Sequence, residues 1–415
     1  MDSTELYRQL LGVTSPWTVE RVEMSVHDVR VDVYLAHAAG SRFACPECGG
    51  EHGVYDHADE RQWRHLDSCQ FRTLLHARAP RVKCPEHGIR QTRLPWAEPG
   101  SRFTLLFEAL AIDVLLSTDV KKAATLLGLT WDEAWHIMER AVVRGRSAKA
   151  EVMPSMIGID EKAIAKGHRY MTLVCDLEQA TVEYIGEDRR QASLREYFAA
   201  FEPDAREALQ AISLDMWPPY ILACRQDVPD ADRKMVFDRF HIMRHVVDAV
   251  DTVRKREHKA LLEAGDTTLT KSKYLWLYSA ENVPEKSREQ FDILKGAHLK
   301  TARAWALKES LRELWDCRHE SQAAAFWKRW YFWATHSQLP PMIAAAKMLA
   351  RHLPNVLTYF EHRISNAMAE GLNSKIATIQ KRACGYRNAS HFKIAVYFHC
   401  GGLDLWPRRW THSKV

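Results

Sequence analysis

Residues 156–185, MIGIDEKAIAKGHRYMTLVCDLEQATVEYI, form the stretch that decides the fold. It holds three apolar runs with the composition of β-strands, at 156–160, 170–177 and 180–185. A helical pattern follows at 192–201, and a fourth strand pattern, 211–215, ends in a carboxylate at Asp215. Strands that give way to helices in this order predict an α/β domain.

Helical patterns dominate the chain beyond this domain. Residues 241–352 are almost wholly helical in spacing and rich in tryptophan, and 366–382 form one more helix. We expect that last helix to complete the α/β domain, so that the helical stretch before it is an insertion.

The N-terminal side divides into a small β module and a small α module. Alternating apolar residues predict strands within 19–37 and 70–84, whereas 103–146 has helical spacing. The whole chain is therefore expected to be a multidomain α+β protein.

Composition and charge exclude several classes of protein. The 415 residues carry 58 Lys and Arg against 53 Asp and Glu, a net charge of +5. No run of about 18 apolar residues occurs, and no basic region precedes an apolar run at the N-terminus, so we expect neither a membrane span nor a secretory signal. Nine cysteines are too few for a disulfide scaffold and favour a reducing cytoplasm, where clustered cysteines bind metal.

Positive charge gathers near the C-terminus. Residues 371–415 contain eight Lys and Arg and one acid, Asp404. A basic end on a near-neutral chain suits a phosphate backbone, although a solvated basic face gives the same pattern. The candidate DNA contacts in this region are Lys375, Lys381, Arg382 and Arg387.

Two short motifs in the β module have the spacing of zinc ligands. Cys45-Pro-Glu-Cys48 is followed by two glycines, and Cys84-Pro-Glu-His87 by one. Four sulfur and nitrogen ligands in two such turns would form a closed tetrahedral site, hence a structural Zn²⁺. Several neighbouring side chains offer alternative ligands, namely His52, His57, His65, Cys69 and His76.

Residues 119–140 have the pattern of a helix-turn-helix. Gly128 lies in the turn, and Thr130 can cap a second helix whose first turn is acidic. An ordinary helical hairpin has the same pattern, but the surrounding lysines and arginines favour DNA binding. The expected DNA contacts are Lys121, Lys122, Trp135, His136, Arg140 and Arg144.

Three carboxylates occur where a metal-dependent nuclease needs them. Asp160 and Asp215 lie at the ends of predicted strands, and Glu370 shares a helical face with Asn366 and Asn373. Carboxylates converging from two strands and a helix would form an oxygen-only site, which prefers Mg²⁺ or Mn²⁺. Any one of these acids taken alone is better explained by a structural role, since Asp at a strand end commonly starts a turn.

Taken together and in order, these motifs resemble the DDE transposases of bacterial insertion sequences, specifically the ISL-three family. The motifs that carry the resemblance are Cys45-Pro-Glu-Cys-Gly, the helix-turn-helix at 119–140, Ile-Gly-Ile-Asp160-Glu, Leu-Asp215-Met-Trp-Pro-Pro-Tyr, Val236-Phe-Asp-Arg-Phe-His241, Asn366-Ala-Met-Ala-Glu370-Gly-Leu-Asn373 and Lys381-Arg-Ala-Cys-Gly-Tyr-Arg-Asn388. Family members usually have a second Cys pair where this chain has Cys84 and His87.

The resemblance implies a ribonuclease-H-like core interrupted by an all-helical insertion, with Asp160, Asp215 and Glu370 as the metal-binding triad. Asp238 and His241 follow a predicted fifth strand. They and Asn373 are candidates for supporting the active site, whereas the alternative for Asp238 and His241 is that they cap the next helix. The expected divisions are an N-terminal segment 1–40, a zinc-binding domain 41–97, a helix-turn-helix domain 98–150, the first part of the core 154–244, the helical insertion 245–360, the last core helices 361–400 and a basic tail 401–415.

The function implied by the resemblance is that of a transposase. It would bind the terminal inverted repeats of its element, cleave there, and join the 3′ ends to target DNA in the bacterial cytoplasm. Because two DNA ends must be held together, we expect a dimer or a larger assembly. We expect no membrane partner. Two alternatives are a zinc and helix-turn-helix transcription regulator, and a hydrolytic nuclease that cuts without joining.

Overall fold

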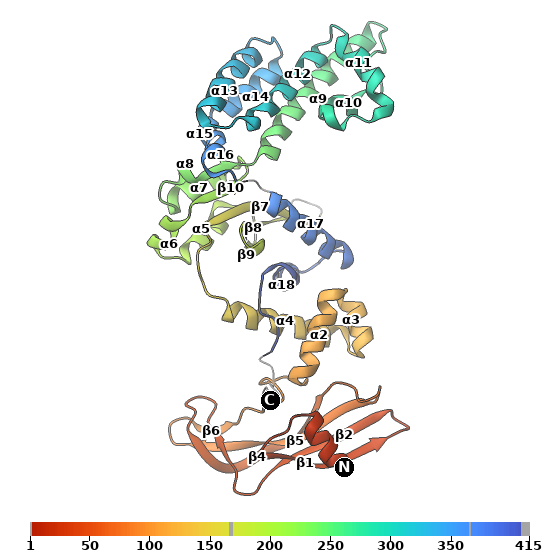
Figure 1. The fold of residues 1–415 in the computed structure, drawn as a ribbon, viewed down its shortest axis with the longest axis vertical. Helices are drawn as coiled ribbons and strands as arrows, with labels where there is room; N and C mark the ends of the chain where they lie inside the picture. The colour runs from red at the N-terminus through yellow and green to blue at the C-terminus, as the bar shows by residue number, and fades with distance from the viewer. Residues whose placement is uncertain (1, 166–168, 365–366, 408–415) are drawn as a thin grey trace. The chain divides into compact units, whose positions relative to one another are not determined.

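The computed structural model describes residues 2–165, 169–364 and 367–407, which divide into two compact units (Figure 1). Unit 1 comprises Met1–Ala150, Tyr397–His399 and the chain from Leu403. Unit 2 comprises Glu151–Val396 and Cys400–Gly402. Residues 403–407 therefore belong to the same unit as the first 150 residues.

Unit 1 begins with helix α1 (Ser3–Leu10) and a six-stranded sheet. The strands are β1 (Trp17–Ser25), β2 (Arg30–His37), β3 (Arg42–Ala44), β4 (Glu51–Arg64), β5 (Arg72–Cys84) and β6 (Gly88–Gln91). Their order is β1-β2-β5-β4-β3, with β6 paired to β5. The strands β2 and β5 are parallel and the other pairs antiparallel. Large apolar side chains, including Trp63, Leu75 and Trp96, are fully buried beneath the sheet.

Strand β4 is an element that the alternation of apolar residues does not reveal. Its sequence, EHGVYDHADERQWR, is polar on both faces, and only Trp63 is buried. It pairs with β5 from Val54, opposite Val82, to Arg64, opposite Leu74. Backbone hydrogen bonds to an apolar neighbour therefore hold this strand in the sheet.

Three helices complete the first 150 residues: α2 (Leu105–Ser117), α3 (Val120–Leu127) and α4 (Trp131–Ala148). The returning C-terminal segment binds to them. The Arg144 guanidinium donates to the Leu405 carbonyl at 2.7 Å, and the Trp406 indole N–H donates to Asp113 at 3.0 Å. The segment comes so close to α4 that a Cβ on Gly145 would lie 2.7 Å from the Leu403 Cβ.

Unit 2 is built on a five-stranded sheet in the order β11-β10-β7-β8-β9. Its strands are β7 (Met156–Ala165), β8 (Arg169–Asp176), β9 (Thr181–Gly186), β10 (Ala211–Leu214) and β11 (Met235–Phe237). The strands β7, β8 and β9 form an antiparallel meander, and β10 and β11 run parallel to β7. All five predicted strands are thus present. The connecting helices are α5 (Gln191–Ala199), α6 (Pro203–Ala208), α7 (Pro218–Asp227) and α8 (Ala231–Lys234).

A helical body follows β11, and two more helices follow that body. It consists of α9 (Arg239–Glu263), α10 (Lys273–Leu277), α11 (Arg288–Gly296), α12 (Lys300–Arg312), α13 (Glu320–Thr335), α14 (Pro340–Ala350), α15 (Leu353–Leu357), α16 (Tyr359–His362) and three short 3₁₀ turns. Most of its tryptophans, such as Trp276 and Trp330, are buried. The last helices are α17 (Ala367–Arg382) and α18 (Ala389–Cys400).

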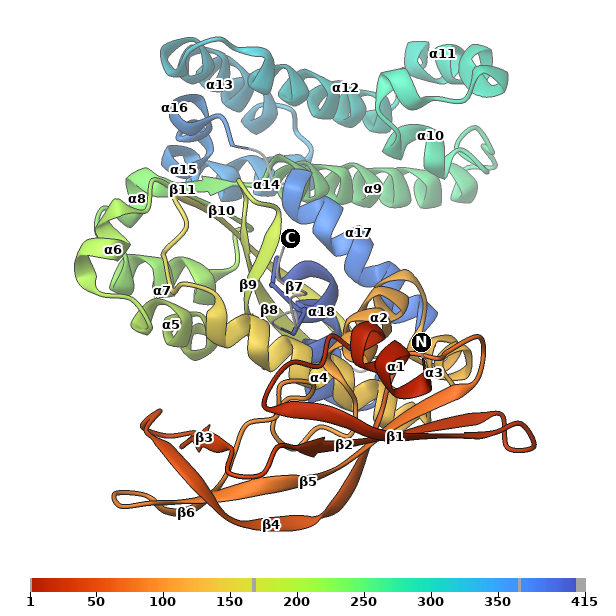
Figure 2. The ribbon, with the colours of Figure 1, turned by 60° about the horizontal axis from the view of Figure 1, so that its bottom comes forward.

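Helix α17 returns to the sheet. The Gln380 side chain donates to the carbonyls of Ala163 and Ile164 in β7, at 3.2 and 2.9 Å. In both views α5 and α7 lie on one side of the sheet and α17 on the other (Figures 1 and 2). Residues that are more than 200 positions apart in the sequence thus meet along one strand.

Candidate functional sites

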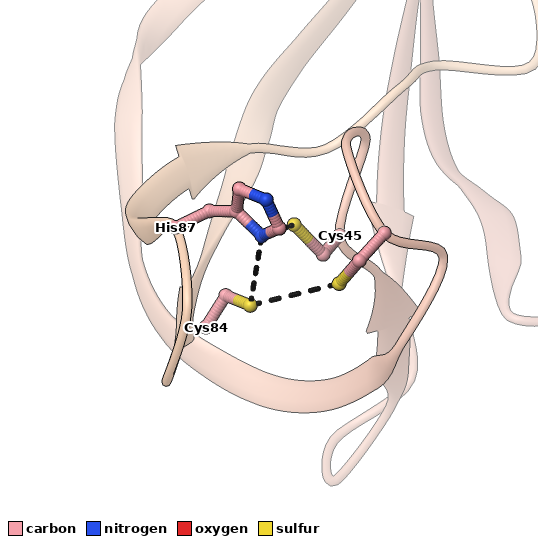
Figure 3. Close-up of side chains that lie close together, drawn as sticks. Cys45, Cys84 and His87 are labelled. Atoms are coloured by element: carbon pink, nitrogen blue, oxygen red, sulfur yellow. Dashed lines mark hydrogen bonds between the residues drawn. The ribbon is translucent and has the colours of Figure 1, made fainter.

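The four predicted zinc ligands come together in unit 1. The ligand atoms of Cys45, Cys48, Cys84 and His87 all lie within 4.8 Å of one another. Figure 3 shows the side chains of Cys45, Cys84 and His87 pointing toward one another. The His87 Nδ1 is 3.5 Å from the Cys84 Sγ and 4.0 Å from the Cys45 Sγ, and the two sulfurs of Cys48 and Cys84 are 3.7 Å apart. Zinc–sulfur bonds of about 2.3 Å at tetrahedral angles place ligand atoms at about this separation.

Local backbone geometry produces this cluster. Cys45 directly follows β3, and Gly49 has a φ of +74°, which lets its N–H turn back to the Cys45 carbonyl at 2.9 Å. Cys84 ends β5, and the turn into β6 carries His87 before Gly88, whose φ is +68°. The backbone amides of Cys48 and Glu47 lower the pKa of the Cys45 thiol, which favours the thiolate that binds metal.

Of the alternative ligands, His65 has another structural role. It is buried, its ring Nδ1 lies 2.9 Å from the Thr104 hydroxyl, and burial lowers its pKa to about 4. Among the described residues, the group of four is the only one with this ligand spacing.

The helix-turn-helix has the predicted caps. Asp119 caps α3 through the Lys122 N–H, and Gly128 ends α3 in the left-handed conformation. Thr130 and Glu133 form a reciprocal capping box at the start of α4. Lys121, Lys122 and His136 are exposed, as a surface that contacts DNA requires.

Three other residues of α4 that were predicted to contact DNA make contacts within unit 1. Trp135 is buried on the same face of α4 as Met138 and Val142, because helical periodicity places these positions together. Arg140 binds the buried Glu108 carboxylate at 2.6 Å, and Arg144 binds Glu98 at 2.6 Å. Arg140 thus ties α4 to α2, and Arg144 ties α4 to the segment before α2; the assignment of these three side chains as DNA contacts stays a prediction.

In unit 2, Asp160 lies on β7, and Asp215 directly follows the neighbouring parallel strand β10. Register pairs Ser213 of β10 with Gly158 of β7, and the chain two residues beyond each of them reaches Asp215 and Asp160. The Asp160 carboxylate is mostly buried, and this burial raises its pKa. Nearby charges act on it in opposite directions: His241 lowers its pKa and Asp215 raises it.

Hydrogen bonds fix both oxygens of Asp160. The Glu161 backbone N–H donates to one oxygen at 2.7 Å, and the Asn373 side-chain amide of α17 donates to the other. The amide oxygen of Asn373 is buried and accepts no hydrogen bond from the described residues. Asn373 therefore presents an unpaired hard oxygen next to a carboxylate.

His241 lies between two further carboxylates. Its Nδ1 is 3.6 Å from Asp215 and its Nε2 is 3.8 Å from Asp238. Asp238 follows β11 and caps α9 by accepting from the Phe240 N–H at 3.1 Å. For Asp238, both interpretations from the sequence apply, because it caps a helix and also lies within the carboxylate cluster.

Glu370 lies in the first turn of α17 and is exposed. It precedes Asn373 by three residues and so shares its helical face. No hydrogen bond or ion pair joins its carboxylate to the other described residues, and the ligand atoms of Asp160, Asp215 and Glu370 do not form a group within 4.8 Å. The structure thus joins α17 to Asp160 through Asn373, and Glu370 lies one turn away. Its predicted partner on this face, Asn366, lies outside the described residues.

Lys162 is a residue that the sequence interpretation missed. Its ammonium donates to the Asn373 carbonyl at 3.1 Å, and burial lowers its pKa. A sequence signal existed, because Lys162 is two positions after Asp160 on one strand and so points to the same face.

The basic residues Lys375, Lys381, Arg382 and Arg387 are all exposed, whereas the end of the predicted basic tail, from residue 408, lies outside the described residues.

The features described so far are those of a class of DNA-processing proteins: a group of zinc ligands, a helix-turn-helix and a sheet with paired carboxylates. Comparison with known families identifies the class. The zinc-finger model of the transposases IS204/IS1001/IS1096/IS1165 matches residues 41–87, and the helix-turn-helix model of transposase family ISL3 matches 92–142. The ISL3 transposase model matches 157–396, more than half of the chain. The chain therefore belongs to the ISL3 (ISL-three) family of transposases, which are enzymes that act on DNA.

Two relatives resemble the chain along nearly their whole length. The transposase for insertion sequence element IS1001 of Bordetella parapertussis is 26% identical over 93% of this chain and 96% of its own. The transposase for IS1557 of Mycobacterium tuberculosis is 25% identical over the full length of both chains. The regulator and simple nuclease alternatives are not favoured by these relatives. In the part of the chain that the structure describes, no helix has the length and apolar character needed to cross a membrane.

Proposed function

We propose that unit 2 is a ribonuclease-H-like core in which Asp160, Asp215 and Glu370 bind two divalent ions, Mg²⁺ or Mn²⁺, and cleave DNA by the DDE mechanism. The observation that carries the proposal is that Asp160 lies on β7 and Asp215 directly follows β10, the parallel strand paired with β7. The sheet order, with an antiparallel meander next to two parallel strands, supports the same core. On this view the helices between β11 and α17 form the insertion.

The chemistry of the site fits hard divalent cations. Its donors are carboxylate oxygens together with the buried, unpaired amide oxygen of Asn373. Glu370 shares a face of α17 with Asn373, and the docking of α17 brings that face toward β7. When bound, two such ions activate a water or a 3′-hydroxyl and stabilise the leaving oxygen of a phosphodiester.

The residues of the chain prepare this site. The Glu161 N–H and the Asn373 amide hold Asp160 in one orientation, so little reorganisation is needed when metal and DNA arrive. His241 is placed to hold Asp215 and Asp238 in position. Lys162 ties the backbone of α17 to β7 at the level of Asp160.

Unit 1 would recognise the terminal inverted repeats. The exposed Lys121, Lys122 and His136 supply contacts from the helix-turn-helix, and the zinc module holds the sheet that precedes it. Lys375, Lys381, Arg382 and Arg387 would follow phosphates near the catalytic carboxylates. The 3′ ends would then be joined to target DNA by an assembly of at least two chains in the bacterial cytoplasm.

Substitution of Glu370 tests the triad. Glu370→Gln should abolish both cleavage and strand joining in Mg²⁺, because an amide of the same shape cannot neutralise the charge of the ions. Binding to repeat DNA should be unchanged. Glu361→Gln is the matched control, since Glu361 is exposed on α16 and outside the site, and it should cleave as the wild type does. Normal cleavage by Glu370→Gln would disprove the assignment of the third acid.

A further inference from the structure

A cavity of about 460 Å³ opens in unit 2 at the first turns of α5 and α7. Trp217, Pro218 and Leu222 line its apolar side, and its charged lining consists of Arg189, Arg190 and Asp188. Trp217 follows Asp215 by two residues, a separation of about 7 Å in extended chain. The cavity therefore opens near Asp215, at the end of the sheet where β10 stops.

The cavity is connected to the catalytic strand by an ion pair. The Arg189 guanidinium is 3.3 Å from the Glu161 carboxylate, and Glu161 is the neighbour of Asp160 on β7. Because side chains alternate along a strand, Asp160 faces α17 while Glu161 faces the cavity. A DNA strand that passes over this end of the sheet would meet both.

The lining has a planar cationic surface. The Arg189 guanidinium lies over the rings of Tyr170 and Trp217, at 4.5 and 4.8 Å from their centroids. The Trp217 indole N–H donates to the Arg189 carbonyl at 3.2 Å and so fixes the ring. Nucleobases stack on aromatic rings and on guanidinium planes of this kind.

Charge in the cavity favours the phosphate that accompanies a base. Each arginine is paired with a carboxylate, Arg189 with Glu161 at 3.3 Å and Arg190 with Asp188 at 3.4 Å, but the Arg190 side chain is 84% exposed, so water weakens its pair. Arg190 can therefore turn toward a phosphate at the mouth of the cavity. An apolar wall, a stacking surface and an exposed cation together match one nucleotide.

We propose that this cavity, here called the Trp217 pocket, holds an unpaired base of the DNA strand next to the phosphodiester that Asp160 and Asp215 process. The proposal rests on the proposed function, because it is that function which brings a DNA strand to this edge of the sheet. Removing a terminal base from its stack would hold the strand in register for cutting and joining.

The test compares DNA probes on the full-length, zinc-loaded protein without magnesium. The probes are one duplex with a short unpaired overhang, the same duplex with blunt ends, and the same overhang built from abasic nucleotides. The wild-type chain should bind the normal overhang about tenfold more tightly than either of the other probes, because stacking of one base contributes about this factor. Equal affinity for normal and abasic overhangs would overturn the proposal.

Three variants locate the effect. Trp217→Leu should lose the preference for the overhang, and Trp217→Phe should restore it, because phenylalanine keeps a stacking surface. Arg190→Ala, at an exposed position that tolerates substitution, should weaken overhang binding several-fold and leave blunt-end binding unchanged. Trp333→Leu, which removes an exposed tryptophan of α13, is the control and should keep the preference. A preference that survives in both Trp217→Leu and Arg190→Ala would place the unpaired base elsewhere.

Two further measurements separate this proposal from others. A free deoxynucleoside monophosphate should not displace the tethered overhang, and displacement at equal concentration would assign the pocket to free nucleotides. Asp160→Asn should retain the overhang preference while it loses cleavage. If Asp160→Asn still cleaves DNA, the proposed function fails although the proposed pocket stands. If Asp160→Asn loses the preference for the overhang, the pocket does not act independently of the Asp160 carboxylate.

Discussion

Asn373 shows how one side chain can connect two distant parts of the chain. Its amide N–H donates to the Asp160 carboxylate, and its amide oxygen is buried without a hydrogen-bond partner among the described residues. Asn373→Ala removes the group that orients Asp160. We expect cleavage to fall by about 10–100-fold, the usual effect of losing an outer-shell partner of a metal ligand. The Mg²⁺ concentration for half-maximal cleavage should rise as well, which kinetic titration will measure.

The same variant should alter the pH dependence of cleavage. Burial raises the pKa of Asp160, and the hydrogen bond from Asn373 lowers it. Because cleavage requires the ionised carboxylate, activity should decline as pH falls through this raised pKa, and in Asn373→Ala the decline should begin at a higher pH. Asn282→Ala, at an exposed position in the helical body, should leave the profile unchanged. An unshifted acidic limb in Asn373→Ala would show that the amide does not act on Asp160.

At the scale of single elements, local sequence pattern predicts some features and fails on others. The strands β7 to β11 were predictable because each contains a short apolar run, although β7 continues to Ala165, beyond the predicted 156–160. The two zinc turns were predictable because four ligands recur at fixed spacing. Strand β4 was not, because its polar side chains reveal nothing of the apolar strand beside it. Trp135, Arg140 and Arg144 looked like DNA contacts because sequence alone does not show that Glu108 and Glu98 face the same side of α4.

Substitution of Arg140 in α4 tests whether this side chain stabilises unit 1 or contacts DNA. Arg140→Ala leaves the fully buried Glu108 carboxylate without its nearest cation, so unfolding of unit 1 should become easier by roughly 3 kcal/mol. Lys122→Ala, at an exposed position of α3, should leave stability nearly unchanged and weaken binding to all DNA sequences alike, with a shallower salt dependence. Thermal denaturation and salt titrations of binding distinguish the two. An Arg140→Ala protein of normal stability that binds DNA poorly would restore Arg140 as a DNA contact.

The zinc turns tie three strands of the first sheet. Cys45 follows β3, Cys84 ends β5, and His87 directly precedes β6, so the ion would cross-link the end of β3 to the turn between β5 and β6. Cys84→Ser should lose zinc and lower the thermal midpoint of unit 1 by several degrees, because a structural zinc contributes directly to folding. Metal analysis should find about one zinc per wild-type chain. Cys69→Ser, at an exposed cysteine outside the cluster, should retain it. A stable, zinc-free wild-type protein would contradict the site.

At the scale of the whole molecule, the division into units does not follow the order of the sequence. The sequence predicts an independent N-terminal part ending near residue 150, but the chain from Leu403 returns to that part. Arg144 and Asp113 both bind this returning segment, and Gly145 has no room for a side chain beside Leu403. Sequence pattern cannot reveal the contact between α4 and the returning segment, because the two are about 260 residues apart. Part of the contact is made by Gly145 and by the backbone carbonyls of Asp404 and Leu405, which no side-chain pattern marks.

The close approach at Gly145 makes the return of the chain testable in the full-length protein. Gly145→Val would place side-chain atoms where Leu403 and the Asp404 carbonyl lie, at 2.7 and 3.0 Å from the first added carbon, so the segment must move away. Valine is a better helix former than glycine, and without the contact this substitution would stabilise α4. We therefore expect a lower thermal midpoint for unit 1 and faster proteolysis near residue 403. Gly296→Val in α11 is the matched control, since nothing lies within 4 Å of the added carbon there. If Gly145→Val is as stable and as resistant to protease as Gly296→Val, the C-terminal segment does not stabilise unit 1, and the first 150 residues alone would suffice for its fold.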